Sequence, residues 1–391
     1  MSWPMTCLGE VASLERKSLL PEEIETGTSY LGLEHIESGG RILGYQRVGA
    51  GELQSNKFMF DPGTLLYGKL RPYLAKICIP DREGCCSTDI LPIRPSQELD
   101  ISYLKHVLLW KPYVDKANSL CSGANLPRIS PSSLLGIEIP LPPLEEQRRI
   151  AAILDKANEL NRLRKRQQSL CRDVELSIYY KEFGSPATNP FNWPTASLAE
   201  MAEIFSDGPF GSNLKSSHYV ESGIRVVRLQ NIGIGNFLDN DKAFVAPSHY
   251  ETIKKHSCLP GDVLIGTLGE PNLRACMLPD GIPVAINKAD CIQMRCDISL
   301  TTPLYITHLL NLPETNQMAS SLILGQTRGR ISMGRLKVFE VPMPPLEKQI
   351  QFARKIGALN SLRRRSASSA SSIRNLVQSY SSWSLAPKDC Q

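Results

Sequence analysis

The feature that most constrains the fold of this chain is an internal repeat. Residues 137–147 read IEIPLPPLEEQ and residues 339–349 read FEVPMPPLEKQ, so the two segments lie 202 positions apart. Nearer the start the offset falls to 198, between DPGTLLYG at 61–68 and LPGDVLIG at 259–266. A period this long indicates two copies of one domain-sized unit and not a solenoid of short repeats. A chain of 391 residues has room for two such units.

Each copy begins with 130 to 140 residues rich in Gly, Pro, Ser and β-branched residues. Short apolar runs bounded by Gly or Pro predict strands at 65–67, 75–79, 263–265 and 284–286. Longer stretches at 101–118 and 303–312 predict helices. We therefore expect an α+β fold, in which each copy is a mixed globular domain built on a twisted sheet.

After the Pro-x-Pro-Pro motif, each copy changes to a helical pattern. The prolines favour an extended approach followed by a helix start, and Glu145 and Glu146 then suit the first helical turn. Apolar residues recur at steps of three and four, which predicts one apolar stripe on each helix. The stripe residues expected at a helix–helix or partner interface are Leu144, Ile150, Leu154, Ala157 and Leu160, then Leu346, Ile350, Ala353, Leu359 and Leu362.

About 40 residues of helix make a rod of roughly 60 Å, which is hard to bury locally. We therefore expect the two helices to pack as an antiparallel coiled coil that separates the globular domains. The alternative is that each helix packs on its own globular domain. The serine-rich stretch 366–372 is a poor helix former, which affects the far end of the second helix. The predicted boundaries are 1–143, 144–184 (helix), 190–345, 346–383 (helix) and 384–391 (tail).

Motifs that would indicate catalysis are missing from the sequence. A phosphate-binding Gly-x-x-x-x-Gly-Lys-Ser/Thr loop does not occur, and Asn189-Pro190-Phe191 lacks the second proline of an amino-methyltransferase loop. The six histidines are scattered, and the eleven cysteines include no Cys-x-x-Cys pair. We therefore expect neither an enzyme active site nor a metal site.

Composition and local pattern predict a cytoplasmic protein. The formal net charge of +5 is too small to indicate a nucleic-acid partner by itself. No apolar run approaches the roughly 18 residues that a membrane span needs, and the start does not resemble a secretory signal. The odd number and irregular spacing of the cysteines favour reduced thiols.

The order of a globular domain, Pro-x-Pro-Pro-Leu-Glu-x-Gln and a long helix, repeated twice, resembles the specificity subunit of type I restriction–modification systems. The most specific motif is LPPLEEQRRI at 141–150, and PFGSNLK at 209–215 followed by VRLQNI at 227–232 resembles a target recognition domain of that family. The resemblance covers nearly the whole chain.

The resemblance implies a function without catalysis by this chain. Each globular domain would be a target recognition domain for one half of a bipartite, asymmetric sequence in double-stranded DNA. The helices would set the half-site spacing and dock two methylation subunits, and restriction (translocase) subunits would join them. S-adenosylmethionine, ATP and Mg²⁺ would then be bound by those partners and not by this chain.

Recognition of DNA requires donors for base edges and cations for phosphates. Arg128 and Arg330 occupy the same repeat position, so they cannot explain two different half-sites, and both could instead be structural or ordinary surface charges. The candidate contacts are Lys69, Arg71, Tyr73 and Arg128 in the first copy, and Lys215, Arg228, Gln230, Asn231, Arg274, Arg328 and Arg330 in the second.

Two other functions fit the same pattern. One is the specificity subunit of a fused nuclease–methyltransferase (type IIB-like) system. The other is a protein-interaction scaffold that does not bind DNA. Salt-sensitive binding to one split DNA sequence distinguishes a DNA-recognition subunit from a scaffold.

Overall fold

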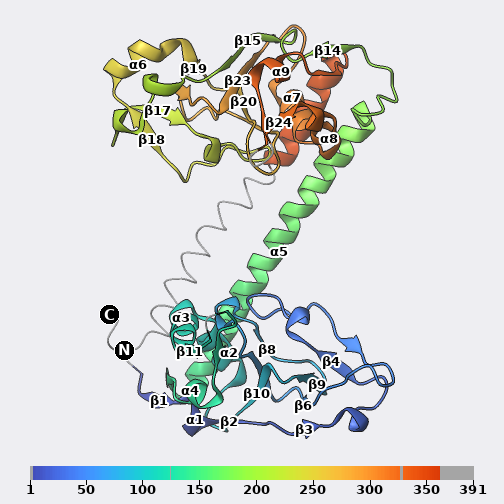
Figure 1. The fold of residues 1–391 in the computed structure, drawn as a ribbon, viewed down its shortest axis with the longest axis vertical. Helices are drawn as coiled ribbons and strands as arrows, with labels where there is room; N and C mark the ends of the chain where they lie inside the picture. Colours follow the sequence, from blue (N-terminus) through green and yellow to red (C-terminus); the bar gives the residue numbers. More distant parts are fainter. Residues whose placement is uncertain (1–2, 124, 326–328, 362–391) are drawn as a thin grey trace. The chain divides into compact units, whose positions relative to one another are not determined.

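The computed structural model describes residues 3–123, 125–325 and 329–361 (Figure 1). These residues form two compact units, one within positions 1–166 and one within positions 167–366. Each unit contains several β-sheets together with short helices, and a single 40-residue helix, α5 (Leu144–Phe183), contributes residues to both. The predicted α+β class is confirmed.

The first unit contains a four-stranded and a five-stranded sheet. The four-stranded sheet has the order β2-β10-β7-β8, and the five-stranded sheet has the order β3-β6-β9-β4-β5. All pairings are antiparallel except that of β4 with β9. The strands are β1 (Met5–Cys7), β2 (Ala12–Leu14), β3 (Ser18–Leu19), β4 (Ser29–Leu31), β5 (Gln46–Arg47), β6 (Lys57–Phe60), β7 (Leu65–Gly68), β8 (Ile77–Cys78), β9 (Gly84–Ser87), β10 (Ile90–Pro95), β11 (Cys121–Ser122), β12 (Arg128–Ile129) and β13 (Glu138–Pro140).

The α-helices of the first unit are α1 (Leu8–Val11), α2 (Ile101–Leu109), α3 (Lys111–Ser119), α4 (Pro131–Leu135) and the start of α5, and the 3-10 turns are η1 (Pro21–Glu23), η2 (Leu33–His35) and η3 (Pro72–Leu74). The helix predicted over 101–118 is thus two helices, which break at Trp110. Pro112 follows this break and sits in the first turn of α3, where a missing backbone N–H costs nothing.

The second unit repeats the same two sheets. Its four-stranded sheet has the order β15-β23-β20-β21, and its five-stranded sheet has the order β16-β18-β17-β22-β19 with β17 and β22 parallel. The strands are β14 (Thr195–Ser197), β15 (Ala202–Asp207), β16 (Tyr219–Val220), β17 (Ile224–Val227), β18 (Ala243–Val245), β19 (Ser257–Cys258), β20 (Val263–Gly266), β21 (Arg274–Met277), β22 (Ala285–Asn287), β23 (Cys291–Cys296), β24 (Ile323–Leu324), β25 (Arg330–Ile331) and β26 (Glu340–Pro342). The α-helices are α6 (Pro247–Ile253), α7 (Pro303–Leu310), α8 (Pro313–Met318) and α9 (Met333–Lys337), and the 3-10 turns are η4 (Gly211–Asn213), η5 (Ser216–His218), η6 (Leu229–Asn231), η7 (Lys254–His256) and η8 (Ala319–Leu322).

The two five-stranded sheets differ only at their edges. Strands β6-β9-β4-β5 of the first unit correspond in order and direction to β19-β22-β17-β18 of the second. The first unit adds β3 beside β6, whereas the second adds β16 beside β18. The duplicated scaffold therefore carries a different extra strand in each copy.

The four-stranded sheet of the first unit is buried on both faces. Leu65 and Ile93 pack with helix residues Tyr103 and Ile150, while the neighbouring Leu66 packs toward the five-stranded sheet. Successive side chains of a strand point to opposite faces, so this alternation explains the continuous apolar run that predicted the strand. In the second unit Val263 and Leu264 divide between two clusters in the same way.

The last residue of the repeated motif is a fully buried glutamine in each copy. Gln147 donates from Nε2 to the carbonyls of Glu98 and Pro142, both at 2.8 Å, and its Oε1 accepts the backbone N–H of Asp100 at 2.8 Å. Since Asp100 is the N-cap residue of α2, one side chain joins the start of α2 to the start of α5. The glutamine thus orients the long helix on its own unit.

The second copy repeats this arrangement almost atom for atom. Gln349 donates to the carbonyls of Pro344 at 2.8 Å and Leu300 at 3.3 Å, and its Oε1 accepts the backbone N–H of Thr302 at 2.9 Å. Nearby, Tyr103 donates to the Pro140 carbonyl at 2.9 Å, as Tyr305 does to that of Pro342 at 2.7 Å. The Pro-x-Pro-Pro-Leu-Glu-x-Gln motif is therefore a structural joint.

The first turns of α5 pack on their own unit. Ile150 and Leu154 belong to the core of the first unit, and Ala157 is also buried. The predicted interface role of Ile150 and Leu154 is therefore wrong, and at this end of the helix the alternative of local packing holds. Two further stripe residues, Leu144 and Leu160, are half-buried. Helix α5 ends at Phe183, before Gly184 with φ +76°.

The last turns of α5 pack against the second helix inside the second unit. Residues 346–361 are helical and run opposite to the end of α5 (Figure 1). The ring of Phe352 lies 5.8 Å from that of Tyr179 and 5.2 Å from that of Phe183, between ring centroids. Lys355 forms an ion pair with Glu182. Here the two helices do pair; Leu362 and the rest of the predicted seam lie outside the described residues.

The buried face of the second helix matches the predicted apolar stripe only in part. Phe352 and Ile356, which are the repeat counterparts of Ile150 and Leu154, are fully buried. Ile350 corresponds to Arg148 and is 38% exposed, so it does not pack in the core of its unit, and its role at a partner interface stays a prediction. The other predicted positions, Leu346, Ala353 and Leu359, are half-buried.

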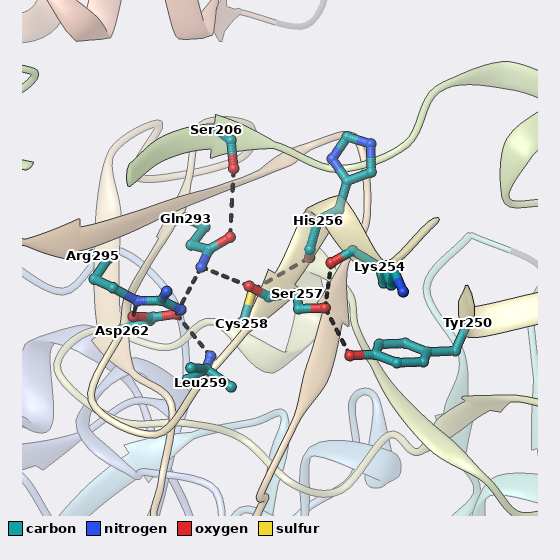
Figure 2. Close-up of polar contacts among 10 residues, drawn as sticks. All are labelled: Ser206, Tyr250, Lys254, His256, Ser257, Cys258, Leu259, Asp262, Gln293 and Arg295. Atoms are coloured by element: carbon teal, nitrogen blue, oxygen red, sulfur yellow. Dashed lines mark hydrogen bonds and ion pairs between the residues drawn. The ribbon is translucent and has the colours of Figure 1, made fainter. Parts of the chain in front are cut away.

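A buried polar network joins the two sheets of the second unit (Figure 2). Gln293 of β23 donates from Nε2 to the Ser257 carbonyl of β19 at 2.8 Å and to Asp262 at 2.7 Å. Asp262, 3% exposed, also forms a bidentate pair with Arg295 at 2.8 and 2.9 Å. Because a buried carboxylate is tolerated only when paired, this network fixes how β19 meets β20 and β23.

The first unit uses the corresponding arginine for the same purpose. Arg94 of β10 binds Asp61 at 2.5 Å and Glu15 at 2.7 Å. The hydrogen bond from Arg94 lowers the pKa of Asp61 below its usual value. Each unit therefore pairs the arginine of β10 or β23 with a carboxylate just before β7 or β20.

We expect Gln147→Ala to destabilise the first unit by about 2–4 kcal/mol, because two buried carbonyls and one buried N–H lose their partner. Gln349→Ala should do the same to the second unit. Chemical denaturation of the full chain, with amide hydrogen exchange to assign the effect to a unit, measures both. The exposed neighbour Arg148→Ala is the control, and a glutamine variant as stable as that control would contradict the role given to the joint.

Phe352→Ala should destabilise the second unit by about 3–5 kcal/mol, because it removes a ring from a fully buried aromatic cluster. Ile350→Ala, two residues earlier in the same helix, should cost less than about 1 kcal/mol. Hydrogen exchange and denaturant titration compare the two variants. Equal losses would show that the helix phase described here is incorrect.

Candidate nucleic-acid interface

Three predicted cations of the first unit lie close together. Leu70 forms an isolated antiparallel bridge with Arg128, although the two residues are far apart in sequence. On either side of this bridge, the Ile129 N–H donates to the Lys69 carbonyl at 3.1 Å and the Arg71 N–H to the Pro127 carbonyl at 2.8 Å. The bridge therefore holds Lys69, Arg71 and Arg128 at one place.

One carboxylate lies among these cations. Asp89 accepts Arg128 at 3.4 Å and approaches Lys69 at 3.8 Å, and all three side chains are at least partly exposed. The pairing orients the cations but leaves an excess of positive charge, which suits a polyanion.

The loop that carries Arg71 also presents an exposed aromatic ring. Arg71 has φ +51°, and Ala75 at the other end of η3 has φ +47°. Left-handed backbone at non-glycine residues costs about 1–2 kcal/mol per residue, and it concentrates at functional sites. Tyr73 lies between these two residues and is 51% exposed, as a ring available for stacking or for a phosphate hydrogen bond would be.

The second unit reproduces the bridge with different neighbours. Leu268 pairs with Arg330, and the Ile331 N–H donates to the Thr267 carbonyl at 3.1 Å. Arg330 lies 3.4 Å from Asp290, as Arg128 lies 3.4 Å from Asp89. The arginine–aspartate pair and the bridging leucine are common to both units.

The residues around the pair differ between the copies. The place of Lys69 is taken by Thr267, and that of Arg71 by Gly269. Shared residues cannot distinguish two half-sites, whereas residues that differ at matched positions can.

A second polar cluster of this unit surrounds Asp241. This carboxylate pairs with the guanidinium of Arg228 and accepts Gln230 Nε2 at 2.6 Å. The guanidinium of Arg228 lies 5.7 Å from the centre of the Tyr219 ring, within range of a cation–π contact. Arg228 and Gln230 are thus brought together and oriented by one acid.

Asn231 has a structural role. It is fully buried, and its Oδ1 accepts the Arg228 N–H at 2.8 Å. Its Nδ2 donates to the Leu238 carbonyl at 2.9 Å and to the Asp241 carbonyl at 2.8 Å. Because its amide donors and its acceptor are all used inside the fold, the predicted DNA contact by Asn231 is wrong.

The predicted DNA contact by Arg274 is wrong for the same reason. Its guanidinium donates to the carbonyls of Ile232 and Leu268, both at 2.8 Å, and burial lowers its pKa below the usual value. Its repeat counterpart is Lys76, which donates to the Leu33 carbonyl at 2.6 Å. Both cations fasten a strand to a 3-10 turn, a role that sequence reasoning missed because the acceptors are backbone atoms.

Two predicted contact residues of the second unit, Lys215 and Arg328, belong to neither of these clusters. Lys215 is exposed at the N-cap of η5, where its backbone N–H donates to His218 Nδ1 at 3.3 Å. Arg328 lies outside the described residues.

Lys288 is a cation that the sequence analysis did not select. It follows β22, and its Nζ lies 5.8 Å from the centre of the Tyr219 ring. The parallel pairing of β17 with β22 brings it near Arg228. The sequence carried no signal for it, because strands some 60 residues apart had to be paired first.

None of the described helices combines the length and the apolar character needed to cross a bilayer.

Comparison with known proteins finds similarity over part of the chain. The family described as "Type I restriction modification DNA specificity domain" matches residues 2–170. The specificity subunit of the type I restriction enzyme EcoDI of Escherichia coli is 30% identical over 192 residues, which are 48% of this chain and 43% of that subunit. The match thus spans less than half the length of that relative.

Two more comparisons extend over more of the chain. The specificity subunit of the type I restriction enzyme MjaVIII of Methanocaldococcus jannaschii is 22% identical over 299 residues, or 72% of this chain and 68% of that subunit. The crystal structure of the type I restriction–modification S subunit from M. genitalium covers 99% of this chain and 96% of its own, with a TM-score of 0.63 and 16% identity. The latter likeness concerns the fold.

The family match ends at residue 170, near the middle of the chain, whereas the same fold is repeated in the second unit. The second unit repeats the sheets, the buried glutamine and the arginine–aspartate bridge of the first. The relatives reported above are named as specificity subunits of type I restriction enzymes. Residues 2–170 therefore match the type I restriction modification DNA specificity domain, and the described chain has the fold of a solved S subunit.

Proposed function

We propose that this chain is a non-catalytic subunit that recognises a bipartite, asymmetric sequence in double-stranded DNA. The observation that carries the proposal is the arginine–aspartate pair at the same backbone bridge in both units, Arg128 with Asp89 and Arg330 with Asp290. Two similar scaffolds with matched cations fit two half-sites, and the differing neighbours Lys69 and Thr267 fit two different sequences.

The two kinds of position would have different tasks. Cations shared by the units suit phosphates, which are the same in every sequence. Residues that differ, such as Lys69, Arg71 and Tyr73 in the first unit and Arg228 and Gln230 in the second, suit base edges or local DNA shape. Lys215, Arg328 and Arg330 complete the proposed contacts of the second unit.

Partner subunits would supply the chemistry. We expect two methylation subunits and restriction (translocase) subunits to assemble with this chain in the cytoplasm. S-adenosylmethionine, ATP and Mg²⁺ would be bound by those partners. A complex that lacks the methylation subunits should therefore transfer no methyl group to DNA.

Arg128→Ala and Arg330→Ala should each weaken DNA binding by about tenfold at roughly 0.1 M salt and lower the salt-dependence slope by about 1, because each removes one phosphate contact. The methylated sequence should stay the same. Binding titrations with the assembled methylation complex at several salt concentrations measure both effects. Lys111→Ala and Lys254→Ala remove exposed cations from the same units as controls. A changed methylation motif would contradict the phosphate role.

Replacing residues 1–140 by the corresponding segment of another family member should change one half of the methylated sequence and preserve the other. The reason is that each unit has its own sheets and its own candidate site. Single-molecule methylome sequencing of cells with the native and the exchanged chain provides the measurement. Altered methylation of both halves would refute modular recognition, and absence of any sequence preference in the native complex would refute DNA recognition itself.

A further inference from the structure

The carboxyl ends of the parallel strand pair differ in charge between the two units. In the second unit Val227 of β17 lies opposite Asn287 of β22. Parallel neighbours are about 4.8 Å apart, so the residues that follow, Arg228 and Lys288, leave the sheet side by side. The second unit therefore places two cations at this edge.

The first unit has no cation at the equivalent positions. There Leu31 of β4 lies opposite Cys86 of β9, and the next residues are Gly32 and Ser87. A side chain at Gly32 would collide with the carboxylate of Glu34. In the first unit the Glu34 carboxylate thus occupies the space that corresponds to the start of the Arg228 side chain in the second.

The Tyr219 ring of the second unit lies within cation–π distance of both Arg228 and Lys288. The Tyr219 ring centre is 5.7 Å from the Arg228 guanidinium and 5.8 Å from Lys288 Nζ. Tyr219 belongs to β16, the edge strand that the first unit lacks. The extra strand therefore supplies the surface on which the cations are arranged; we call Tyr219, Arg228 and Lys288 the platform.

The platform has unused binding capacity. The ammonium of Lys288 forms no hydrogen bond or ion pair with any described residue, so its contact to Tyr219 leaves three donors available. Arg228 Nε and Tyr219 Oη are buried without a hydrogen-bond partner in the part of the chain that the structure describes. Buried polar atoms without partners are uncommon in folded proteins.

The remaining charges at this edge favour an anion. Asp241 offsets Arg228, and Arg225 pairs with Asp239, but nothing described offsets Lys288. Arg330 lies at the same loop, because it approaches the Ala289 carbonyl at 3.5 Å. The platform therefore lies next to the arginine–aspartate pair of the same unit, on the side of β16.

We propose that Lys288 and Arg228 contact the DNA of the second half-site, and that the platform makes recognition by the second unit differ from that by the first. This inference rests on the proposed function and adds Lys288 and Tyr219 to it. In the first unit the corresponding contacts come from the loop with Lys69 and Arg71. The two units thus use different strand ends of one scaffold to meet DNA.

Lys288→Ala is the primary test, since its ammonium forms no hydrogen bond with any described residue. In the assembled methylation complex, affinity for a duplex with the native bipartite site should fall about tenfold. Arg228→Lys keeps the charge but loses the planar fork that pairs with Asp241, and it should reduce discrimination in the second half-site. Lys254→Ala, which removes an exposed lysine of the same unit, serves as the matched control and should bind as the native chain does.

Duplexes altered in only one half distinguish the outcomes. A salt slope reduced by about 1 with an unchanged motif would place Lys288 on a phosphate, and lost preference at one base pair of the second half would place it on a base; both support the proposal. If native complex binds specifically but Lys288→Ala and Arg228→Lys bind like Lys254→Ala, the platform is refuted and the proposed function stands. If native complex shows no sequence preference, the proposed function itself fails.

Discussion

In each half of this molecule, one buried glutamine fixes the start of the helix that follows the Pro-x-Pro-Pro motif. Gln147 and Gln349 each join three backbone groups that belong to the Pro-x-Pro-Pro segment, to the turn before a core helix and to the start of that helix. A buried amide that satisfies both its donor and its acceptor specifies orientation more strictly than apolar contacts do, because misalignment leaves polar atoms without partners. The helix that follows each motif therefore starts in a defined direction on its own unit.

On this shared scaffold, the positive charge differs from one unit to the other. The arginine–aspartate bridge occurs in both units, whereas Lys69 and Arg71 have no cationic counterpart in the second unit and Arg228 and Lys288 have none in the first. A duplicated domain can keep its fold-determining residues and its sequence-independent contacts while the strand ends and edge strands change. Such a division of tasks is what recognition of an asymmetric target by two related domains requires.

Helix α5 has different environments along its length. Its first turns bury Ile150 and Leu154 in the first unit, and its last turns bury Tyr179 and Phe183 in the second. Leu163, Leu170 and Val174 between these ends are exposed among the described residues. The apolar stripe of α5 thus packs into two separate cores, one in each unit. Among the described residues, α5 pairs with the second helix only at its end.

The sequence alone determined the duplication, the α+β class, the helix start at the Pro-x-Pro-Pro motif and the strands near 65–67, 263–265 and 284–286, because each depends on local pattern or on self-similarity. It also selected Arg128 and Arg330 from their common position. It misjudged Asn231 and Arg274, because their hydrogen-bond acceptors are backbone carbonyls that only the folded chain brings within reach. Lys288 was not found at all. Only tertiary structure decided these points, since pairing of β17 with β22 and the bridge at Leu70 and Leu268 bring together residues that no local pattern relates.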